Sequence, residues 1–71
     1  GMAKMRAAFN LALYHEVQDD LEQAQAYLNE AMGMVGEDSP EYVVLEFYHR
    51  QLREQIKQNQ QLRMQMQRFE R

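Results

Sequence analysis

The chain has 71 residues, a net charge of −3 and no cysteine. This length allows one small domain with a thin core, for which association with a partner is the expected source of extra stability, since disulfides and thiolate metal sites are excluded. No apolar run approaches the roughly 20 residues of a membrane-spanning helix, and the opening residues lack the apolar segment of a secretory signal.

Charge is unevenly distributed along the chain. Residues 1–49 carry two basic and nine acidic side chains, a net charge of −7, whereas residues 50–71 carry six basic and two acidic ones, a net charge of +4. The sequence therefore predicts an acidic body with a basic tail. Gly1 ahead of Met2 is interpreted as the remnant of a cleaved tag, which assigns residues 1–2 to the start of the chain.

The first expected helix covers residues 3–18. Met5, Ala8 and Ala12 recur at steps of three and four, as residues on one face of a helix do. No glycine or proline interrupts them, and the alanines raise the helix propensity. This face is expected to meet the next helix.

A second helix is expected to run back along the first from a turn at Asp19. The Asp19 carboxylate is expected to cap it, with Glu22 completing a capping box, and Gly36 is expected to follow its end with a positive φ. Its buried face is predicted from residues spaced by three and four: Leu21, Ala24, Leu28, Ala31 and Val35.

The third helix has the plainest start signal. Ser39 is expected as its N-cap and Pro40 as its first residue, and nothing breaks the helical pattern through Arg71. Since no strand alternation is present, the fold class is expected to be all-α, with three helices. A helical hairpin over Leu11–Val35 is expected to pack against the first half of one long C-terminal helix.

Small and large residues recur in the hairpin at a fixed spacing. Ala12 and Ala24 are small where antiparallel helices would cross, and Leu28 fills the groove beside them. The residues in register are Leu11, Ala12, His15, Ala24, Leu28 and Ala31. This pattern resembles one tetratricopeptide repeat (TPR). The departures are Ala8 for Trp, His15 for Tyr, Leu28 for Phe and Gly36 for Pro.

A step of 34 residues maps the first helix onto the start of the third, so that the resemblance covers roughly residues 5–52. It implies a module that binds a protein or peptide segment on the face formed by the first and third helices. Arrays of such repeats followed by a long helix look like the sensory region of bacterial membrane-bound regulators. The candidate partner-binding contacts are Leu11, His15, Tyr42, Glu46 and His49.

The expected domain of residues 3–52 is followed by an overhanging helical tail, residues 53–71, which is basic and rich in glutamine. A heptad pattern runs from Leu45 into this tail, with apolar residues at six of eight core positions. One core position holds Leu45, Leu52, Asn59 and Met66, and the other holds Tyr48, Gln55, Leu62 and Phe69. We expect the tail to self-associate. The residues expected to be buried between chains are Leu62, Met66 and Phe69.

Side chains with catalytic or metal-binding chemistry are sparse. His15 and His49 are expected to approach each other, but no dense ligand cluster accompanies them. The pair Asp19–Asp20 is better explained by a helix start than by acid–base catalysis. No phosphate loop, nucleophile elbow or cysteine nucleophile is present. The sequence therefore predicts a protein that is not an enzyme, with no cofactor, no metal and no small-molecule substrate.

The expected function is a non-enzymatic interaction module with a protein or peptide partner, as a fragment of a larger signalling or regulatory protein. The alternative is a dimerising coiled-coil stalk, or a juxtamembrane segment of a membrane-bound sensor whose basic tail lies near a lipid surface. Nucleic-acid binding through the tail is disfavoured, because the body is acidic. The sequence predicts a homo-oligomer, a dimer, and does not predict the compartment.

Overall fold

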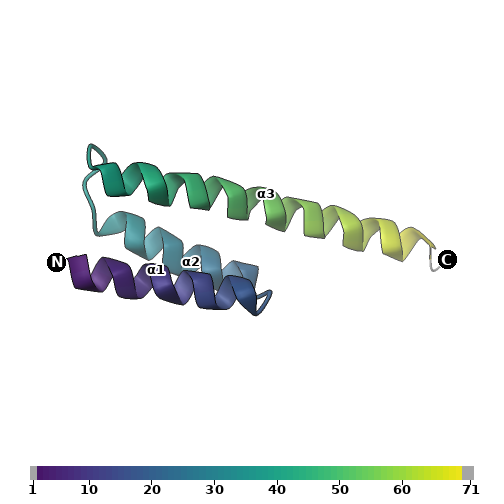
Figure 1. Cartoon of the computed structure of the whole chain (residues 1–71). Helices are drawn as coiled ribbons and strands as arrows, with labels where there is room; N and C mark the ends of the chain where they lie inside the picture. The colour runs from purple at the N-terminus through teal and green to yellow at the C-terminus, as the bar shows by residue number, and fades with distance from the viewer. Residues whose placement is uncertain (1, 70–71) are drawn as a thin grey trace.

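The computed structural model describes residues 2–69 and contains three helices, α1 (Met2–Val17), α2 (Leu21–Gly33) and α3 (Pro40–Phe69). The first two form an antiparallel hairpin, and α3 runs back over α2 and extends well past it (Figure 1). The 30 residues of α3, at a rise of ~1.5 Å each, make a rod of roughly 45 Å. The predicted all-α fold of three helices is confirmed.

A core of small and branched apolar residues joins the helices. Ala24 and Ala31 on α2 are completely buried, and Ala8 and Ala12 on α1 are 4% exposed. Because alanine side chains are short, the backbones of α1 and α2 can approach closely where these residues meet. The other core members are larger: Met5, Leu21, Leu28, Leu45 and Leu52.

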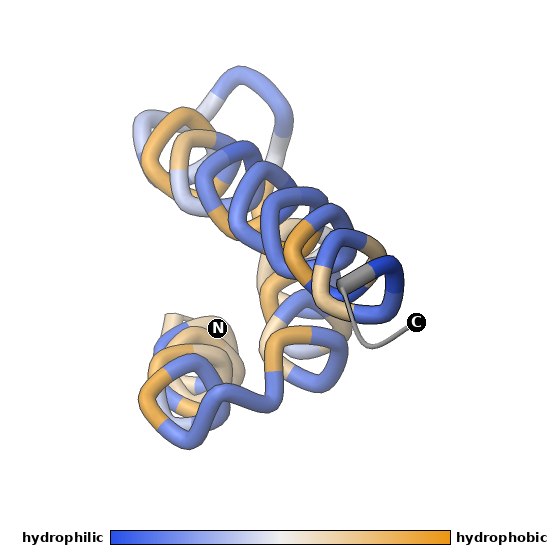
Figure 2. The backbone as a smooth tube through the Cα atoms, turned by 90° about the vertical axis from the view of Figure 1, so that its right-hand side faces the viewer, coloured by the Kyte–Doolittle hydropathy of each residue, from blue (hydrophilic) through white to orange (hydrophobic). Residues whose placement is uncertain are grey.

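The other two helices both pack on α2. Among the described residues, no Cα atom of α1 lies within 8 Å of a Cα atom of α3, whereas both helices approach α2 this closely. Figure 2 shows α1 and α3 set apart from each other. The prediction that the third helix covers the hairpin therefore holds for α2. The helix α3 contacts α1 through Tyr48, whose ring meets that of Phe9 edge-on with 5.2 Å between the ring centroids.

The ends of α2 differ from the sequence predictions. Its N-cap is Asp20 rather than Asp19, and the Asp20 carboxylate makes no capping hydrogen bond. That carboxylate instead lies 3.5 Å from Nδ1 of His15. Asp19 has a φ of 62°, which a short polar side chain tolerates and which turns the chain between the helices. Gly36 does not have a positive φ, because α2 is already closed at Met34, which keeps a right-handed conformation.

The start of α3 agrees with its prediction. The Oγ atom of Ser39 accepts a hydrogen bond from the backbone N–H of Tyr42 at 3.2 Å and donates one to the carbonyl of Gly36 at 2.7 Å. Pro40 follows as the first helical residue, where its fixed φ suits the helix and its missing N–H costs nothing. The helix then continues unbroken to Phe69. Residues 70–71 and the side chain of Phe69 lie outside the described part of the chain.

None of the three described helices is both long and apolar enough to cross a membrane.

Candidate interaction surface

The contact between Phe9 and Tyr48 identifies the sides of α1 and α3 that face each other. Residues four apart on a helix lie on the same side, so Leu13 accompanies Phe9 and Val44 accompanies Tyr48. Phe47 adjoins them, with its ring edge-on to that of Tyr48 at 6.0 Å between the centroids. These five residues border what we name the α1–α3 surface. Leu13 is 36% exposed, Tyr48 40% and Val44 52%, which leaves much of this apolar surface open to solvent.

One row of residues on α3 has apolar ends and a polar centre. Val44 and Tyr48 form one end, and Leu62 and Met66 form the other, with 56% and 62% of their surface exposed. Successive members are three or four residues apart, so they follow one side of the helix. We name this row the outer stripe. It consists of Val44, Tyr48, Gln51, Gln55, Asn59, Leu62 and Met66.

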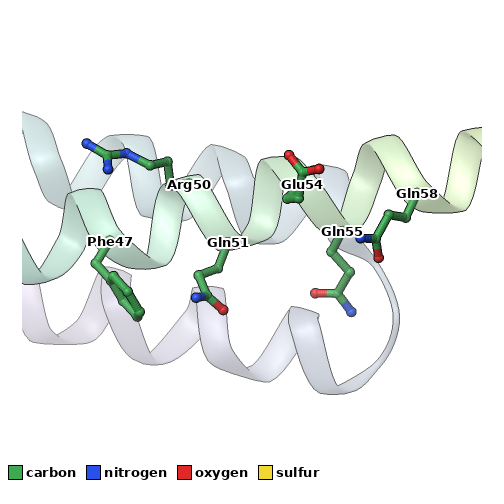
Figure 3. A pocket seen from close by; sticks show the side chains of 6 residues that line it. All are labelled: Phe47, Arg50, Gln51, Glu54, Gln55 and Gln58. Carbon is green, nitrogen blue, oxygen red and sulfur yellow. The ribbon is translucent and has the colours of Figure 1, made fainter.

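An open pocket of about 640 Å³ lies on α3 beside the outer stripe (Figure 3). Figure 3 shows Phe47, Gln51 and Gln55 extending to the side on which α1 lies. Primary amides both donate and accept hydrogen bonds, so the lining offers polar contacts beside an aromatic ring. All the lining residues belong to α3: Phe47, Arg50, Gln51, Glu54, Gln55 and Gln58.

Two of the predicted partner contacts point away from the α1–α3 surface. Leu11 stands two residues from Phe9, and Glu46 stands two residues from Tyr48. A step of two residues turns the side chain by about 200° around a helix. Leu11 is 42% exposed, and Glu46 accepts a hydrogen bond from Arg50 at 2.7 Å.

A third predicted contact, His15, packs against the middle of α2 and lies near its N-cap. Its ring stacks on Tyr27 with 5.2 Å between the centroids and 15° between the ring planes. The Asp20 carboxylate lies 3.5 Å from its Nδ1 atom. His15 therefore supports the turn of the hairpin, where its imidazole fills space between helices.

The remaining predicted contacts, Tyr42 and His49, are half-buried on α3. His49 lies near Glu46 and Arg53, on the flank of α3 that faces away from α1. Burial lowers the pKa of His49, and the Arg53 charge lowers it further, while Glu46 opposes both. The structure thus does not bring the five predicted residues together on one face, and their role in binding stays a prediction.

The residues predicted for self-association lie where α3 overhangs the hairpin. Leu62 and Met66 are exposed, as is every residue from 60 to 68. The side chain of Phe69, the third predicted residue, lies outside the described part of the chain. The two described residues form one end of the outer stripe, so they belong to the same row as Val44 and Tyr48.

A second pocket, of about 280 Å³, lies where the turn between α1 and α2 meets α3. Asp19, Asp20 and Glu22 line one side, and Arg63 lies on the other. Opposite charges across such an open site attract weakly. Within residues 2–69, no group of three or more His, Cys, Asp or Glu side chains is placed to hold a metal ion.

The outer stripe shares Tyr48, Gln55, Asn59, Leu62 and Met66 with the core positions of the heptad pattern and differs from it near the hairpin. Leu45 and Leu52, at one predicted core position, are buried against the hairpin. The row one residue earlier, which contains Val44 and Gln51, stays exposed. Tyr48 follows Val44 by four residues, and Leu62 follows Tyr48 by fourteen. This spacing places all three on one side of a helix, so the sequence already contained the signal for the exposed row.

A family model described as a domain of unknown function (DUF6340) matches residues 1–54. The match contains the hairpin and the first half of α3, and it ends before the overhanging part. Searches of curated proteins and of solved structures found no significant match.

Proposed function

The chain belongs to the DUF6340 family, whose description names no activity, and we propose that it is a non-enzymatic module that binds a protein or peptide partner at the α1–α3 surface. One observation carries this proposal. Val44, Phe47 and Tyr48 stand together on α3 with 52%, 58% and 40% of their surface exposed. Contiguous exposed apolar side chains mark interaction sites, and aromatic residues often dominate the binding energy of an interface.

The hairpin contributes the other side of this surface through α1. Phe9 contacts Tyr48, and Leu13 follows it on the same side of α1. A partner segment laid beside α3 would therefore touch two helices. The resemblance to a TPR supports the same side of the molecule, because that family binds peptides on the face of its first and third helices. In this proposal the chain is a segment of a larger signalling or regulatory protein.

A photoreactive phenylalanine analogue tests the surface directly. Placed at Phe47 in cells of the source organism, it is expected to trap a partner, whereas the same group at Tyr14 is not. Tyr14 is a matched control, because it is 54% exposed but stands five residues from Phe9, which turns its side chain about 140° around α1 from the α1–α3 surface. For the purified partner, Phe47→Ala is expected to weaken affinity by about ten-fold or more, and Tyr14→Ala by less than about two-fold.

An alternative flank is tested in the same assay. If Glu46→Ala abolishes binding and Phe47→Ala leaves it unchanged, the partner binds beside Tyr42, Glu46 and His49 instead. That outcome would contradict the proposed surface. Trapping with equal yield at Phe47 and Tyr14 would contradict it as well, because random collision would then explain the products.

A further inference from the structure

We infer that the outer stripe of α3 is an antiparallel homodimer interface, in which the tail of one copy covers the α1–α3 surface of the other. The inference rests on the proposed function, because it names a second copy of this chain as the partner of that surface. Three features of the described residues carry it: the symmetry of the stripe, the distribution of charge along α3, and the uncovered length of the helix.

The apolar ends of the stripe are symmetric about Gln55. Tyr48 and Leu62 each stand seven residues from it, and Val44 and Met66 each stand eleven residues from it. A two-fold axis through Gln55 therefore sets Tyr48 against Leu62 of the second copy and Val44 against Met66 of the second copy. A two-fold interface requires such self-complementarity, because the same patch is used by both copies.

The polar centre obeys the same symmetry. Gln51 and Asn59 each stand four residues from Gln55, so amides meet amides on both sides of the axis. Amides supply donors and acceptors to each other, and a polar position inside an otherwise apolar seam fixes the register of paired helices. A slipped register would place an amide against Tyr48 or Leu62, which leaves polar groups without partners.

Charge favours the antiparallel arrangement over the parallel one. The first ten residues of α3 carry Glu41 and Glu46, whereas residues 60–69 carry Arg63 and Arg68. Glu46 is paired with Arg50, so the charge difference acts along the length of the helix and not through contacts at the stripe. Antiparallel pairing brings the acidic end of each helix to the basic end of the other, and parallel pairing brings like charges together. The whole chain shows the same difference, since residues 1–49 have a net charge of −7 and residues 50–71 a net charge of +4. Complementary charge of this kind selects orientation and speeds encounter.

The length of α3 makes this pairing possible without displacing the hairpin. The stripe from Val44 to Met66 covers 23 residues, or ~34 Å of helix. The hairpin lies along the first half only (Figure 1), and residues 60–68 are all exposed. The overhanging end of one copy can therefore lie beside Tyr48 and Phe9 of the other, and the two hairpins stand at opposite ends of the pair.

Single cysteines test the orientation, because the chain has none of its own. Only a residue on the two-fold axis of an antiparallel pair meets itself, so Gln55→Cys is expected to form a disulfide dimer with diamide as the two-electron oxidant. Leu62→Cys alone is expected to stay uncross-linked, whereas a mixture of Leu62→Cys and Tyr48→Cys is expected to cross-link. Lys57→Cys is the matched control, because it lies two residues from Gln55 on the opposite flank.

Sedimentation equilibrium of the full chain tests the contact itself. Leu62→Glu is expected to weaken dimerisation by about ten-fold or more. Met64→Glu is expected to leave it unchanged, since Met64 is 58% exposed but two residues away from the stripe. Both positions are exposed in the single chain, so both variants are expected to keep the helical circular dichroism of the wild type.

Three outcomes would overturn the inference. The first is a wild-type monomer at hundreds of micromolar. The second is self-cross-linking of Leu62→Cys as fast as that of Gln55→Cys, which would indicate a parallel pair. The third is equal cross-linking at Gln55→Cys and Lys57→Cys. A monomer that binds a different protein and loses it on Phe47→Ala would overturn the dimer while the proposed function stands.

Discussion

Leu28 and Leu62 are the same residue in the same kind of secondary structure, yet Leu28 is 2% exposed and Leu62 is 56% exposed. The first belongs to a packed region, in which α2 is covered by α1 on one side and by α3 on another. The second belongs to the overhang of α3, residues 60–69, which continues after the hairpin has ended (Figure 1). The 13 residues of α2 reach only ~20 Å at 1.5 Å each, so they cannot cover a rod of roughly 45 Å.

The comparison separates two sources of helix stability. In the packed region, burial of an apolar face stabilises each helix, as in most globular proteins. In the overhang, the backbone is held by helix propensity and by continuity with the packed half, because short helices are marginal in water without tertiary contacts. Apolar periodicity persists through both regions, so the pattern alone does not tell which leucine is buried.

The sharpest test of this difference replaces each leucine by alanine. Leu28→Ala is expected to destabilise the fold by about 2–5 kcal/mol, because it removes buried surface and leaves a cavity among the alanines of α1 and α2. Leu62→Ala is expected to change the free energy of unfolding by less than about 0.5 kcal/mol. The measurement is urea unfolding followed by circular dichroism, at a concentration where the chain is monomeric. Equal losses in the two variants would remove the distinction between the regions.

A second test enlarges alanine side chains of α2 instead of shortening a leucine. Ala24→Leu is expected to destabilise by about 1–3 kcal/mol, because a completely buried alanine leaves no room for a larger side chain. Ala26→Leu, on the exposed side of the same helix, is expected to be nearly neutral, since leucine and alanine have similar helix propensities. Thermal unfolding of both variants checks this prediction. A stable Ala24→Leu variant would show that α1 and α2 leave room for a larger side chain where they cross.

The packed region shows how far sequence reasoning reaches. Ser39 and Pro40 predicted the start of α3 correctly, because capping depends on the side chain and its neighbours in sequence. The spacing of Ala12, Ala24 and Leu28 predicted the hairpin core, because the small positions needed for close packing recur at helical steps. Such local signals were sufficient for the number of helices and for the buried faces of α1 and α2.

The remaining errors come from information that lies outside the local sequence. Val44 and Leu45 are both apolar and adjacent, so two rows of α3 fit a helical pattern. Only the position of α2 decides that Leu45 is buried and that Val44 is exposed. The cap was misplaced for a similar reason. Asp19 and Asp20 are chemically identical, and the left-handed conformation of Asp19 moves the N-cap role to Asp20.

A smaller effect is expected at the start of α3. Ser39→Ala removes the Oγ atom that accepts from the Tyr42 N–H and donates to the Gly36 carbonyl, and it is expected to cost about 1 kcal/mol. Ser39→Asp keeps an acceptor but loses the donor, so it is expected to recover part of that loss. Urea unfolding of the three chains supplies the numbers. If the aspartate variant were no better than the alanine variant, the bond to Tyr42 would contribute nothing measurable.

The smallest expected effect is a pH dependence contributed by His49 in the packed region. Burial and the Arg53 charge lower the pKa of His49, so between that pKa and the ordinary value the unfolded chain binds more protons at His49 than the folded chain does. The stability due to neutral His49 is therefore complete above the ordinary pKa of a histidine and falls as the pH drops through this window. Wild type is expected to lose more stability than His49→Gln between about pH 7.5 and about pH 5, by less than about 0.5 kcal/mol. His15 and the carboxylates are present in both chains, so the difference between two urea titrations isolates His49. Equal losses would mean that His49 is as well hydrated as the side chains of the overhang, and the boundary of the packed region would then exclude this flank of α3.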